Sequence, residues 1–446
     1  MTRRSTFVAP HRSGRFEGLQ HEMTSQFDPR VFLKSLFDAA IAAADPELAI
    51  RANLPAKPKG RTIVIGAGKG SAQMAAAFER VWDAPLEGVV VTRYGYGTVC
   101  ERIEIVEAAH PVPDDAGLVA SKRLFDAVSN LTEDDLLVAL MSGGGSALLP
   151  SPPEGMTLDD EIAVNKALLA SGAPISVMNM VRKHLSTIKG GRLAACAYPA
   201  KVFSLVVSDI PGDNPAFIAS GPTVPDATNR DDALKIIDRY GLKFPDAVLA
   251  HLKSQYAHAP RPDDKIFARN EVRVITSAAM SLEAAAKEAR RQGIEAVTLS
   301  DAMEGEAREV AHVHAAIARE VADRNRPFKK PVVILSGGET TVKIHGKGGK
   351  GGRNSEFLLS FALEIDGYAN IHALAADTDG TDGSEDNAGA FADGTTVSRL
   401  LEVGVDGTNL LNANDAWTAF AAIGDLFVSG PTGTNVNDLR AILVMM

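Results

Sequence analysis

Short runs of β-branched and aliphatic residues alternate with longer amphipathic stretches along this chain, and nearly every short run ends in Gly, Ser or Asp. Strand, helix and strand in succession predict an α/β protein with a largely parallel sheet. In open α/β sheets the ligand crevice lies beyond the carboxyl ends of the strands, so these polar ends are candidate site positions. The predicted strands lie within "RTIVIG" (61–66), "EGVVVT" (87–92), "DLLVALMSGGG" (135–145), "KVFSLVVSDIPG" (201–212), "VRVITS" (272–277), "AVTLSD" (296–301), "PVVILSGG" (331–338) and "IHALAADTDG" (371–380).

A length of 446 residues suits two or three domains. The polar, proline-containing stretch around 250–268 lacks clear periodicity and is the expected boundary. We therefore expect a disordered extension over 1–27, a first α/β domain over 28–255 and a second over 266–446. "LMSGGGSA" resembles "ILSGGETT", and "VVSDIPGD" loosely resembles "LAADTDGT". Two similar sheets facing one cleft, or chance likeness between strand ends, explain this equally well.

A net charge of -10 argues against a general nucleic-acid or anionic-membrane binder, so an anionic ligand requires a local basic site. The two cysteines, Cys100 and Cys196, form no disulfide framework and have no metal-ligand spacing, which favours a reducing, cytoplasmic setting. The purely apolar runs are too short to span a bilayer. Paired arginines near the N-terminus are not followed by the apolar segment of an export signal.

"GAGKGS" (66–71) lies between a predicted strand and a predicted helix. It has neither the Walker A spacing nor the third glycine of the dinucleotide fingerprint, and the next strand ends at Thr92 and Arg93 without an acid for a ribose. A glycine turn with exposed amides at a helix N-terminus, carrying Gly68 and Lys69, favours an anion site. The alternative is a tight turn with a solvated lysine.

A second glycine turn, "SGGGS", follows another strand, and its amides can form an anion nest. The alternative is a flexible loop. The candidate residues of this turn are Ser142, Gly143, Gly144, Gly145 and Ser146.

In "NMVRKHLSTIKGGR" (179–192), Asn179, Arg182, Ser186 and Lys189 share one face of a predicted helix that ends at two glycines. A basic polar face without acids suits a ligand as well as it suits a solvated surface.

Carboxylates at two strand ends are candidates for metal binding or proton transfer. Asp209 ends an apolar strand, and Asp377, Asp379 and Asp382 lie in "DTDGTDGSEDN", which fails the EF-hand pattern. Mg²⁺ takes few protein carboxylates together with phosphate and water, so Asp209 and Asp379 are its predicted ligands. An acidic, turn-rich surface loop is the alternative for the second group.

"HGKGGKGGRNSE" (345–356) gathers three cations in an acidic protein and leads into a predicted helix. Arg353 and Asn354 are therefore expected at a helix N-terminus, where an anion is favoured, and arginine can clamp a carboxylate or phosphate with two hydrogen bonds. We hypothesise that the loop closes over a polyanion and places Arg353 on it. A disordered linker is the alternative. The turn that precedes this loop supplies Gly337, Gly338 and Glu339 as further candidates.

Ten motifs occur in the order of one known family: "VIGAGKGSAQMA", "HPVPDDAG", "LMSGGGSALLPSP", "VRKHLSTIKGGRLA", "VVSDIPGDN", "ASGPTVPD", "ILSGGETTV", "GGRNSE", "ALAADTDGTDG" and "GPTGTNVNDL". From about residue 30 to the C-terminus they resemble the class II glycerate 2-kinases, whose C-terminal part is called the MOFRL domain. Gly70-Ser71 and Ser355 depart from the residues that family members often carry there.

The resemblance implies a transferase: an ATP-dependent kinase that phosphorylates D-glycerate to 2-phosphoglycerate with Mg²⁺. It implies a Rossmann-like N-terminal domain, a smaller α/β C-terminal domain and a cleft between them. Lys69 and Arg353 occupy the positions of the functional cations associated with the family. Members are also labelled hydroxypyruvate reductases.

We expect Lys69 and Arg353 to neutralise the transferring phosphoryl group and the glycerate carboxylate, and Asp209 or Asp379 to hold Mg²⁺ or orient the hydroxyl. The "SGGGS" and "SGGET" turns would hold phosphates. One alternative is a reductase using NAD(P)H, and another is a catalytically inactive sugar-acid or nucleotide-binding protein. The partners expected are D-glycerate and ATP, with a homodimer compatible with the sequence.

Overall fold

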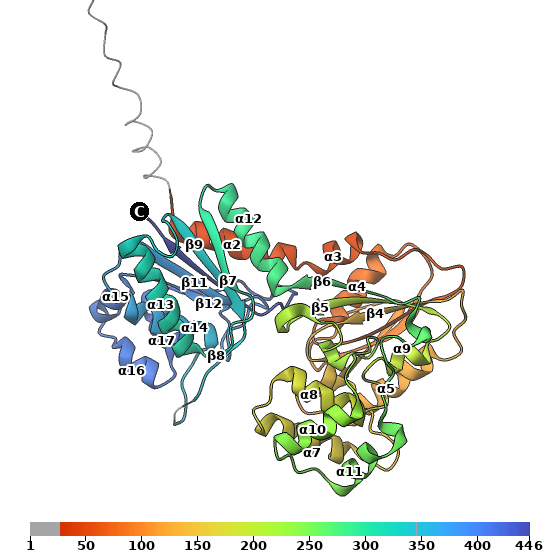
Figure 1. Cartoon of the computed structure of the whole chain (residues 1–446). Helices are drawn as coiled ribbons and strands as arrows, with labels where there is room; N and C mark the ends of the chain where they lie inside the picture. The colour runs from red at the N-terminus through yellow and green to blue at the C-terminus, as the bar shows by residue number, and fades with distance from the viewer. Residues whose placement is uncertain (1–26, 345) are drawn as a thin grey trace, which may run out of the picture.

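The computed structural model describes residues 27–344 and 346–446 and forms two lobes, each built on a six-stranded sheet (Figure 1). The first sheet is parallel throughout and has the order β3-β2-β1-β4-β5-β6. We call the part built on it the first lobe. Its strands are β1 (Thr62–Ala67), β2 (Glu87–Arg93), β3 (Ile103–Ala108), β4 (Leu136–Met141), β5 (Lys201–Ser208) and β6 (Glu271–Ser277).

Both faces of the first sheet are covered, as its nearly continuous apolar strands require. Along β1, Ile63 and Ile65 point into one core and Val64 points into the other. One face carries α3 (Pro46–Ala52) and α4 (Ser71–Val81); the other carries α5 (Asp115–Val128) and α9 (Arg192–Cys196). This three-layer arrangement confirms the predicted α/β class for the first lobe.

A separate group of helices hangs below the first sheet in Figure 1 and has its own apolar core. We call it the helical subdomain. It consists of α7 (Leu158–Ala170), α8 (Ile175–Arg182), α10 (Arg230–Arg239) and α11 (Asp246–Lys253). Because these helices lie between strands of one sheet in the sequence, they form an insertion at the edge of the cleft, not a further layer.

The second sheet has the order β13-β12-β11-β14-β9-β7, and only its β7–β9 pair is parallel. The expectation of a largely parallel sheet was therefore wrong for this lobe, because β14 inserts antiparallel between β9 and β11. The two sheets differ in order and direction, so the strand-end likeness does not reflect two similar sheets. The second-lobe strands are β7 (Glu295–Ser300), β9 (Val332–Gly338), β11 (Ile371–Asp377), β12 (Gly389–Asp393), β13 (Leu426–Phe427) and β14 (Asp438–Val444), with β8 (Gly305–Glu306) and β10 (Thr340–Thr341) as a separate pair.

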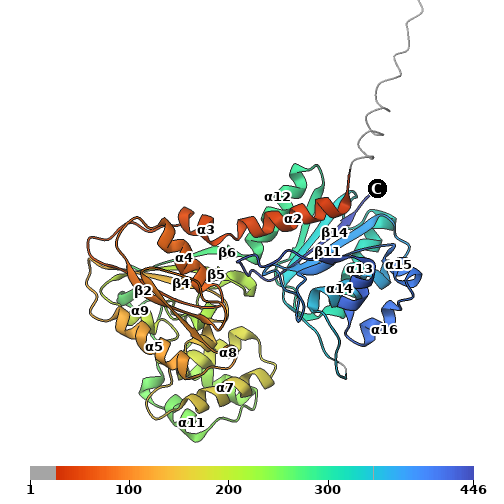
Figure 2. The same cartoon turned by 180° about the vertical axis from the view of Figure 1, so that it is seen from behind.

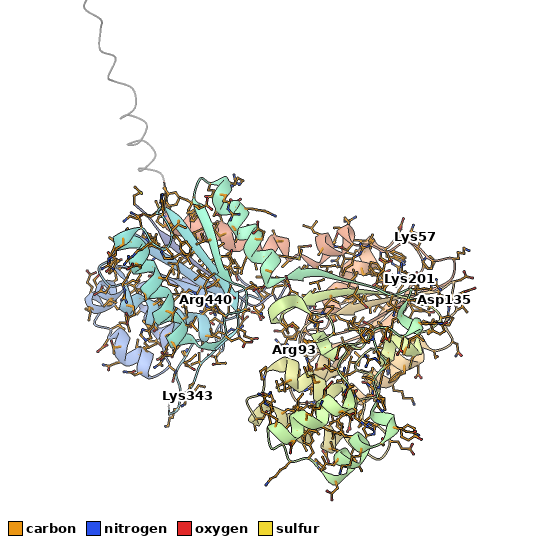
Figure 3. The ribbon with its side chains drawn as sticks, viewed as in Figure 1. Lys57, Arg93, Asp135, Lys201, Lys343 and Arg440 are labelled. Carbon is orange, nitrogen blue, oxygen red and sulfur yellow. The ribbon has the colours of Figure 1, made fainter. Side chains whose placement is uncertain are left out.

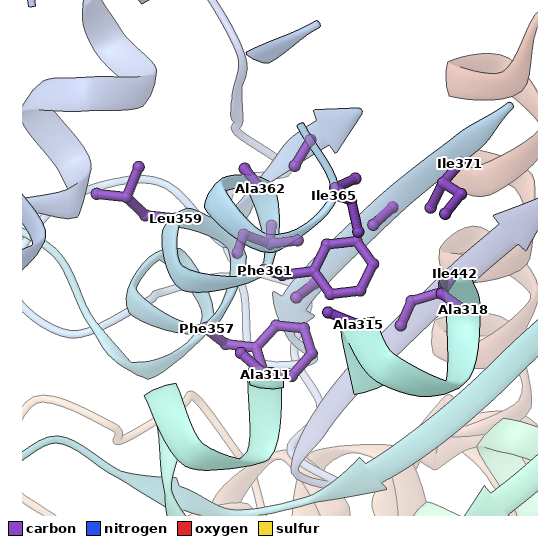
Figure 4. Packing of buried hydrophobic residues seen from close by; sticks show 14 of the residues in the cluster. Ala311, Ala315, Ala318, Phe357, Leu359, Phe361, Ala362, Ile365, Ile371 and Ile442 are labelled. Carbon is purple, nitrogen blue, oxygen red and sulfur yellow. The ribbon is translucent and has the colours of Figure 1, made fainter. Parts of the chain in front are cut away.

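Helices also cover both faces of the second sheet. On one face, Phe357 and Phe361 of α14 pack against Ala311 and Ala315 of α13 (Figure 4), whose small side chains let the two helices approach closely. The helices on this face are α13 (Ala307–Arg324), α14 (Arg353–Glu364), α15 (Thr396–Glu402), α16 (Gly407–Asn412) and α17 (Ala416–Ile423). The other face carries α2 (Pro29–Ala43) and α12 (Ala278–Arg291), which lie side by side in Figure 2.

Within the described residues, the chain crosses between the lobes twice. Helix α2 packs on the second sheet although the next helix, α3, packs on the first. Strand β6 completes the first sheet and leads directly into α12 of the second lobe. The sheets thus divide the chain differently from the predicted ranges 28–255 and 266–446. The predicted extension over 1–27 lies, apart from Phe27, outside the described residues.

Among the residues that the structure describes, no helix combines the length and the apolar character that a membrane span requires.

Candidate functional site

A cavity of about 380 Å³ lies between the two lobes, at the carboxyl ends of the first-sheet strands. Asn437 of the second lobe closes part of it by donating a hydrogen bond from its amide nitrogen to the carbonyl of Asp209 at 2.9 Å. The predicted cleft between two α/β lobes is therefore confirmed. Three groups of residues line it: His110, Gly144, Ser146 and Asp209 from the first sheet; Asn165, Asn179 and Arg182 from the helical subdomain; Gly338, Glu339 and Asn437 from the second lobe.

The turn "GAGKGS" has the predicted place between β1 and α4, but its amides are not exposed. The Gly68 amide donates to Val91, the Lys69 amide to Gly143 at 2.8 Å, and the Gly70 amide to the Ser142 hydroxyl at 3.0 Å. A Cβ at Gly68 would lie 2.2 Å from the Ser142 Oγ, so the turn packs directly on the loop after β4. The expectation of exposed amides in this turn was wrong, and any anion contact here must come from the Lys69 side chain.

The second glycine turn, "SGGGS", differs from the first in the hydrogen bonding of its amides. Within the described residues, the amides of Gly143, Gly144 and Gly145 donate to no other group. Gly144 has φ 78° and precedes α6 (Gly145–Leu148). The two flanking serines are already engaged: the Ser142 hydroxyl accepts from Gly70, and the Ser146 hydroxyl lies 2.7 Å from that of Ser220. The open amides make this turn a candidate anion nest.

His110 joins the site although sequence reasoning did not select it. A Cβ at Gly144 would lie 3.0 Å from the Lys69 Cγ and 3.1 Å from the His110 Nε2, so the glycine is enclosed between these two side chains. Burial and the charges of Lys69 and Arg93 lower the pKa of His110 to about 4. The imidazole is therefore neutral near pH 7. Its position after β3, at the start of "HPVPDDAG", was the available signal.

Asp209 lies directly beside the open glycine turn. A Cβ at Gly143 would overlap its carboxylate, at 1.6 Å from Oδ2, so only glycine fits there. Burial raises the pKa of Asp209 to about 6; Lys69 opposes the rise, and Glu339 from the other lobe adds to it. Among the described residues, no side chain donates a hydrogen bond to this carboxylate. Asp209 is thus a half-buried acceptor facing the cleft beside a cation.

Arg353 does not face the cleft as a free cation. Its guanidinium contacts Asp438 through Nε at 2.8 Å, Asp377 through Nη2 at 2.7 Å and Glu339 through Nη1 at 2.9 Å. Burial alone would lower the pKa of Arg353, but the three carboxylates outweigh it and raise the pKa. The hypothesis that Arg353 is held ready for a polyanion does not fit this arrangement, because the protein already supplies its counter-charges.

The helix start at Arg353 is confirmed, and so is an anion at that end, but the anion belongs to the protein. The Asp382 carboxylate accepts hydrogen bonds from the amides of Asn354 at 2.9 Å and Ser355 at 2.8 Å. The Asn354 side chain is fully buried and donates to Asp438. Asn354 therefore supports α14 and does not line the cleft, and Asp382 is engaged as a helix cap.

The basic face predicted over 179–189 is not one helix. Helix α8 ends at Arg182, a short 3₁₀ turn follows, and Ser186 is extended. Gly191 precedes α9 and does not terminate α8. Lys189 is buried and contacts Glu161 of α7 at 2.6 Å, so its ammonium group already has a partner within the protein, and ligand binding by Lys189 stays a prediction.

Asn179 and Arg182 line the cleft as predicted, but they differ in how many of their hydrogen-bonding groups are used within the protein. The Asn179 amide is used within the protein, donating to the Phe217 carbonyl and accepting from the Ser220 hydroxyl. Arg182 donates only through Nε, to Asn165 at 2.8 Å, which leaves both terminal nitrogens without an acceptor among the described residues. Burial lowers the pKa of Arg182, and Glu161 opposes that change. Arg182 is therefore a cation with a free face toward the cleft.

In the second lobe, Gly338 and Glu339 line the cleft, whereas Gly337 is held inside β9. Gly338 has φ 115°, and a Cβ there would lie 2.2 Å from the Met303 amide, so glycine is required. Asp379 binds the Thr381 amide through one carboxylate oxygen. No set of three His, Cys, Asp or Glu side chains suited to a metal ion occurs within residues 27–344 and 346–446.

Comparison with known proteins gives a consistent set of relatives. Residues 32–253 match a family described as Domain of unknown function (DUF4147), and residues 332–438 match the MOFRL family. A protein of Agrobacterium vitis, provisionally named a hydroxypyruvate reductase, is 52% identical over 93% of this chain and 94% of its own length. The glycerate 2-kinase of Pyrococcus horikoshii is 42% identical, covering 86% of this chain and 88% of its own. The crystal structure of glycerate kinase from Thermotoga maritima matches with a TM-score of 0.83 at 38% identity, over 94% of this chain and 100% of that one.

Proposed function

The chain belongs to the glycerate 2-kinase family, with a MOFRL region in its second lobe, and we propose that it transfers the terminal phosphoryl group of ATP to the C2 hydroxyl of D-glycerate in the cleft between the lobes. The observation that carries this proposal is the grouping of Asp209, Lys69 and the open amides of 143–145 at the carboxyl ends of β1, β4 and β5. Phosphoryl transfer needs an oriented hydroxyl and charge neutralisation more than covalent catalysis.

Asp209 is our candidate for the group that orients the C2 hydroxyl and accepts its proton. With a pKa of about 6, its carboxylate is mostly ionised near neutral pH yet more basic than an ordinary aspartate. Lys69, whose charge already acts on Asp209, would neutralise the oxygens of the transferring phosphoryl group, and the amides of Gly143 and Gly144 would donate to them.

Arg182 is our candidate for binding the glycerate carboxylate. Its Nε is held by Asn165, and its two terminal nitrogens have no acceptor among the described residues, which leaves one edge of the guanidinium for a carboxylate. Arg353, by contrast, is satisfied by three protein carboxylates, so we now assign it to positioning Glu339 and Asp377 and not to ligand contact.

The carboxylates at the cleft fit Mg²⁺ only in the manner of a nucleotide-bound ion. Mg²⁺ is commonly bound by one or two carboxylates together with substrate phosphates and water, so the absence of a three-residue cluster among the described residues is compatible with it. Asp379 stays our proposed ligand, and Asp209 is the alternative ligand, in which case it would not act as the base; among the described residues, one Asp379 carboxylate oxygen accepts no hydrogen bond. When bound, the ion would neutralise charge on the phosphates of ATP.

The test is a coupled assay with ATP, Mg²⁺ and D-glycerate, with the phosphorylated position read by phosphorus NMR. We expect 2-phosphoglycerate from the wild-type protein and none from Asp209→Asn. Lys57→Ala is the matched control, because among the described residues Lys57 forms an ion pair with Asp83 alone, on the surface of the first lobe away from the cleft (Figure 3). A product phosphorylated at C3, or no product, would refute the proposal.

The name of the Agrobacterium vitis relative makes a hydroxypyruvate reductase the second candidate. Dinucleotide binding at a glycine turn relies on free amides at the pyrophosphate, and the amides of Gly68, Lys69 and Gly70 are bonded within the protein. Titration with NADH and NADPH, followed by hydroxypyruvate turnover, separates the two activities. Saturable binding with oxidation of NAD(P)H would favour the reductase.

Cytoplasmic location and homodimer formation stay predictions of ours. Both cysteines are free thiols in the structure, in keeping with a reducing compartment. Light scattering coupled to size-exclusion chromatography measures the assembly state directly.

A further inference from the structure

Arg93 is a further cation at a strand end of the first lobe. It is the last residue of β2, the strand next to β1, whose end carries the Lys69 turn. The Thr92 hydroxyl donates to the Lys69 carbonyl at 3.2 Å, so the ends of the two strands are joined. Figure 3 shows Arg93 on the side of the first lobe that faces the second lobe.

The Arg93 guanidinium lies over an aromatic ring. Its central carbon lies 3.5 Å from the ring centroid of Tyr96, and the Tyr96 amide donates to the Arg93 carbonyl at 3.1 Å. The loop itself is pinned, because the amides of Gly95 and Gly97 both donate to one Glu107 oxygen at 2.9 Å. The side chain is therefore positioned before any ligand arrives, which lowers the entropic cost of binding.

The charge of Arg93 has no ion-pair partner in the part of the chain that the structure describes. No carboxylate among the described residues lies within 4.0 Å of it, and its Nε is buried without an acceptor. Burial lowers the pKa of Arg93, and only Asp379 of the second lobe acts in the opposite direction. This is the reverse of Arg353, whose guanidinium contacts three carboxylates. A buried, unsatisfied donor on a cation is costly unless a ligand completes it.

The charges of Arg93 and Lys69 act on the same region of the first lobe, around His110. Both lower the pKa of His110, and His110 lines the cleft beside Gly144 and its open amide. Two cations, a neutral imidazole and free amides thus gather at neighbouring strand ends of an acidic protein. That combination suits a ligand with more than one negative charge.

We propose that Arg93 binds the terminal phosphates of the nucleotide, with Tyr96 holding its guanidinium in place. This deepens the proposed function and rests on it for the identity of the ligand. Arginine presents a planar fork that matches a phosphate through two parallel hydrogen bonds, and stacking on one face leaves its edges free. The alternative role of Arg93 is structural: as a latch, Arg93 and Asp379 would attract each other and hold the two lobes together.

Direct binding tests this without catalysis. Adenosine, ADP and ATP are titrated calorimetrically into the full-length protein in the presence of EDTA, so that no metal contributes. For Arg93→Met we expect ATP to bind roughly tenfold or more weakly and adenosine to bind as in the wild type, because one charge-assisted contact to phosphate is lost. Arg93→Lys keeps the charge but not the fork, and we expect an intermediate loss.

Arg61→Met is the matched control, since Arg61 is an exposed arginine next to the amino end of β1 and pairs with Asp135. Unchanged ATP affinity in Arg93→Met, or an equal loss for adenosine, would overturn the proposal. An equal loss of ATP affinity in Asp379→Asn would overturn it in favour of the latch. Wild-type protein that binds ATP through Arg93 but makes no 2-phosphoglycerate would refute the proposed function and leave this inference standing.

Discussion

Lys69 and Arg353 were predicted as a pair of functional cations, and the two lobes treat them in opposite ways. Lys69 has no salt-bridge partner among the described residues and acts electrostatically on Asp209 and His110. Arg353 is bonded to Asp438, Asp377 and Glu339. The difference lies entirely in the counter-charges. A cation is available to a ligand only where the fold leaves it unpaired, and sequence position at a glycine turn or helix start does not decide that.

The largest expected effect is on stability, at Arg353. Removing one partner of a buried ionic cluster leaves uncompensated charges, so Arg353→Ala should lower the free energy of unfolding by about 3–5 kcal/mol. Urea denaturation followed by circular dichroism measures it. Adding Asp377→Asn should restore part of the loss, because one of the stranded carboxylates is removed. A stable Arg353→Ala protein that has lost only activity would return Arg353 to ligand binding.

Lys69→Ala should show the converse pattern, with catalysis lost and stability kept. We expect the rate constant kcat to fall at least ~100-fold, as for the loss of a transition-state contact. The unfolding transition should match that of Lys57→Ala, the surface control. A large destabilisation by Lys69→Ala would show that the two cations are alike after all.

The next effect concerns pH, through Asp209. Its folded-state pKa of about 6 lies above the ordinary 3.8, so kcat/KM should fall about tenfold per pH unit below 6 as the carboxylate becomes protonated. The same shift means that folded protein binds this proton more tightly than unfolded protein. The stability that this group contributes is present below about pH 4 and is lost as the pH rises through 6.

Asp209→Asn removes this titration and should therefore raise the stability near neutral pH, by about 1–2 kcal/mol, while abolishing turnover. A pH–rate profile that stays flat through pH 6 would contradict the role of Asp209, and so would an Asn variant less stable than the wild type.

The smallest effect is expected at Asp382, the anion at the start of α14. Asp382→Ala should cost about 0.5–2 kcal/mol of stability, the range for a lost helix cap, with a smaller effect on turnover than Lys69→Ala has. The same denaturation and activity measurements check it. A loss of ATP affinity as large as that of a cleft variant would mean that the second lobe carries part of the phosphate site.

Local patterns predicted much of the fold. The runs around β1, β4 and β9 were read correctly because aliphatic stretches ending in Gly or Ser are a local signal. The antiparallel second sheet was missed because β14, at the end of the chain, inserts between β9 and β11. Strand direction depends on such distant pairings, which hydrophobic periodicity does not encode.

The site was predictable to a similar extent. Asp209, Lys69 and the glycines of 143–145 follow from their places at strand ends, and the structure brings them together. The ion pairs of Lys189 and Arg353 could not be predicted from the local sequence, because their partners are distant. Glu161 lies 28 residues from Lys189, and Asp438 lies 85 residues from Arg353. Arg93 was noted only because it stands where a dinucleotide-binding strand would end in an acid. That it has no ion-pair partner among the described residues is a property of the fold.

The double crossing of the chain has a consequence for how the protein is made. Helix α2 leaves the ribosome roughly 250 residues before its partner α12 does. At 5–20 residues per second that delay is roughly 10–50 s. During this time its apolar stripe of Phe32, Leu33, Leu36 and Phe37 has no native surface to cover it. Helix α2 is thus synthesised long before α12, the helix against which it packs. Its apolar face stays exposed on the nascent protein for much of the synthesis.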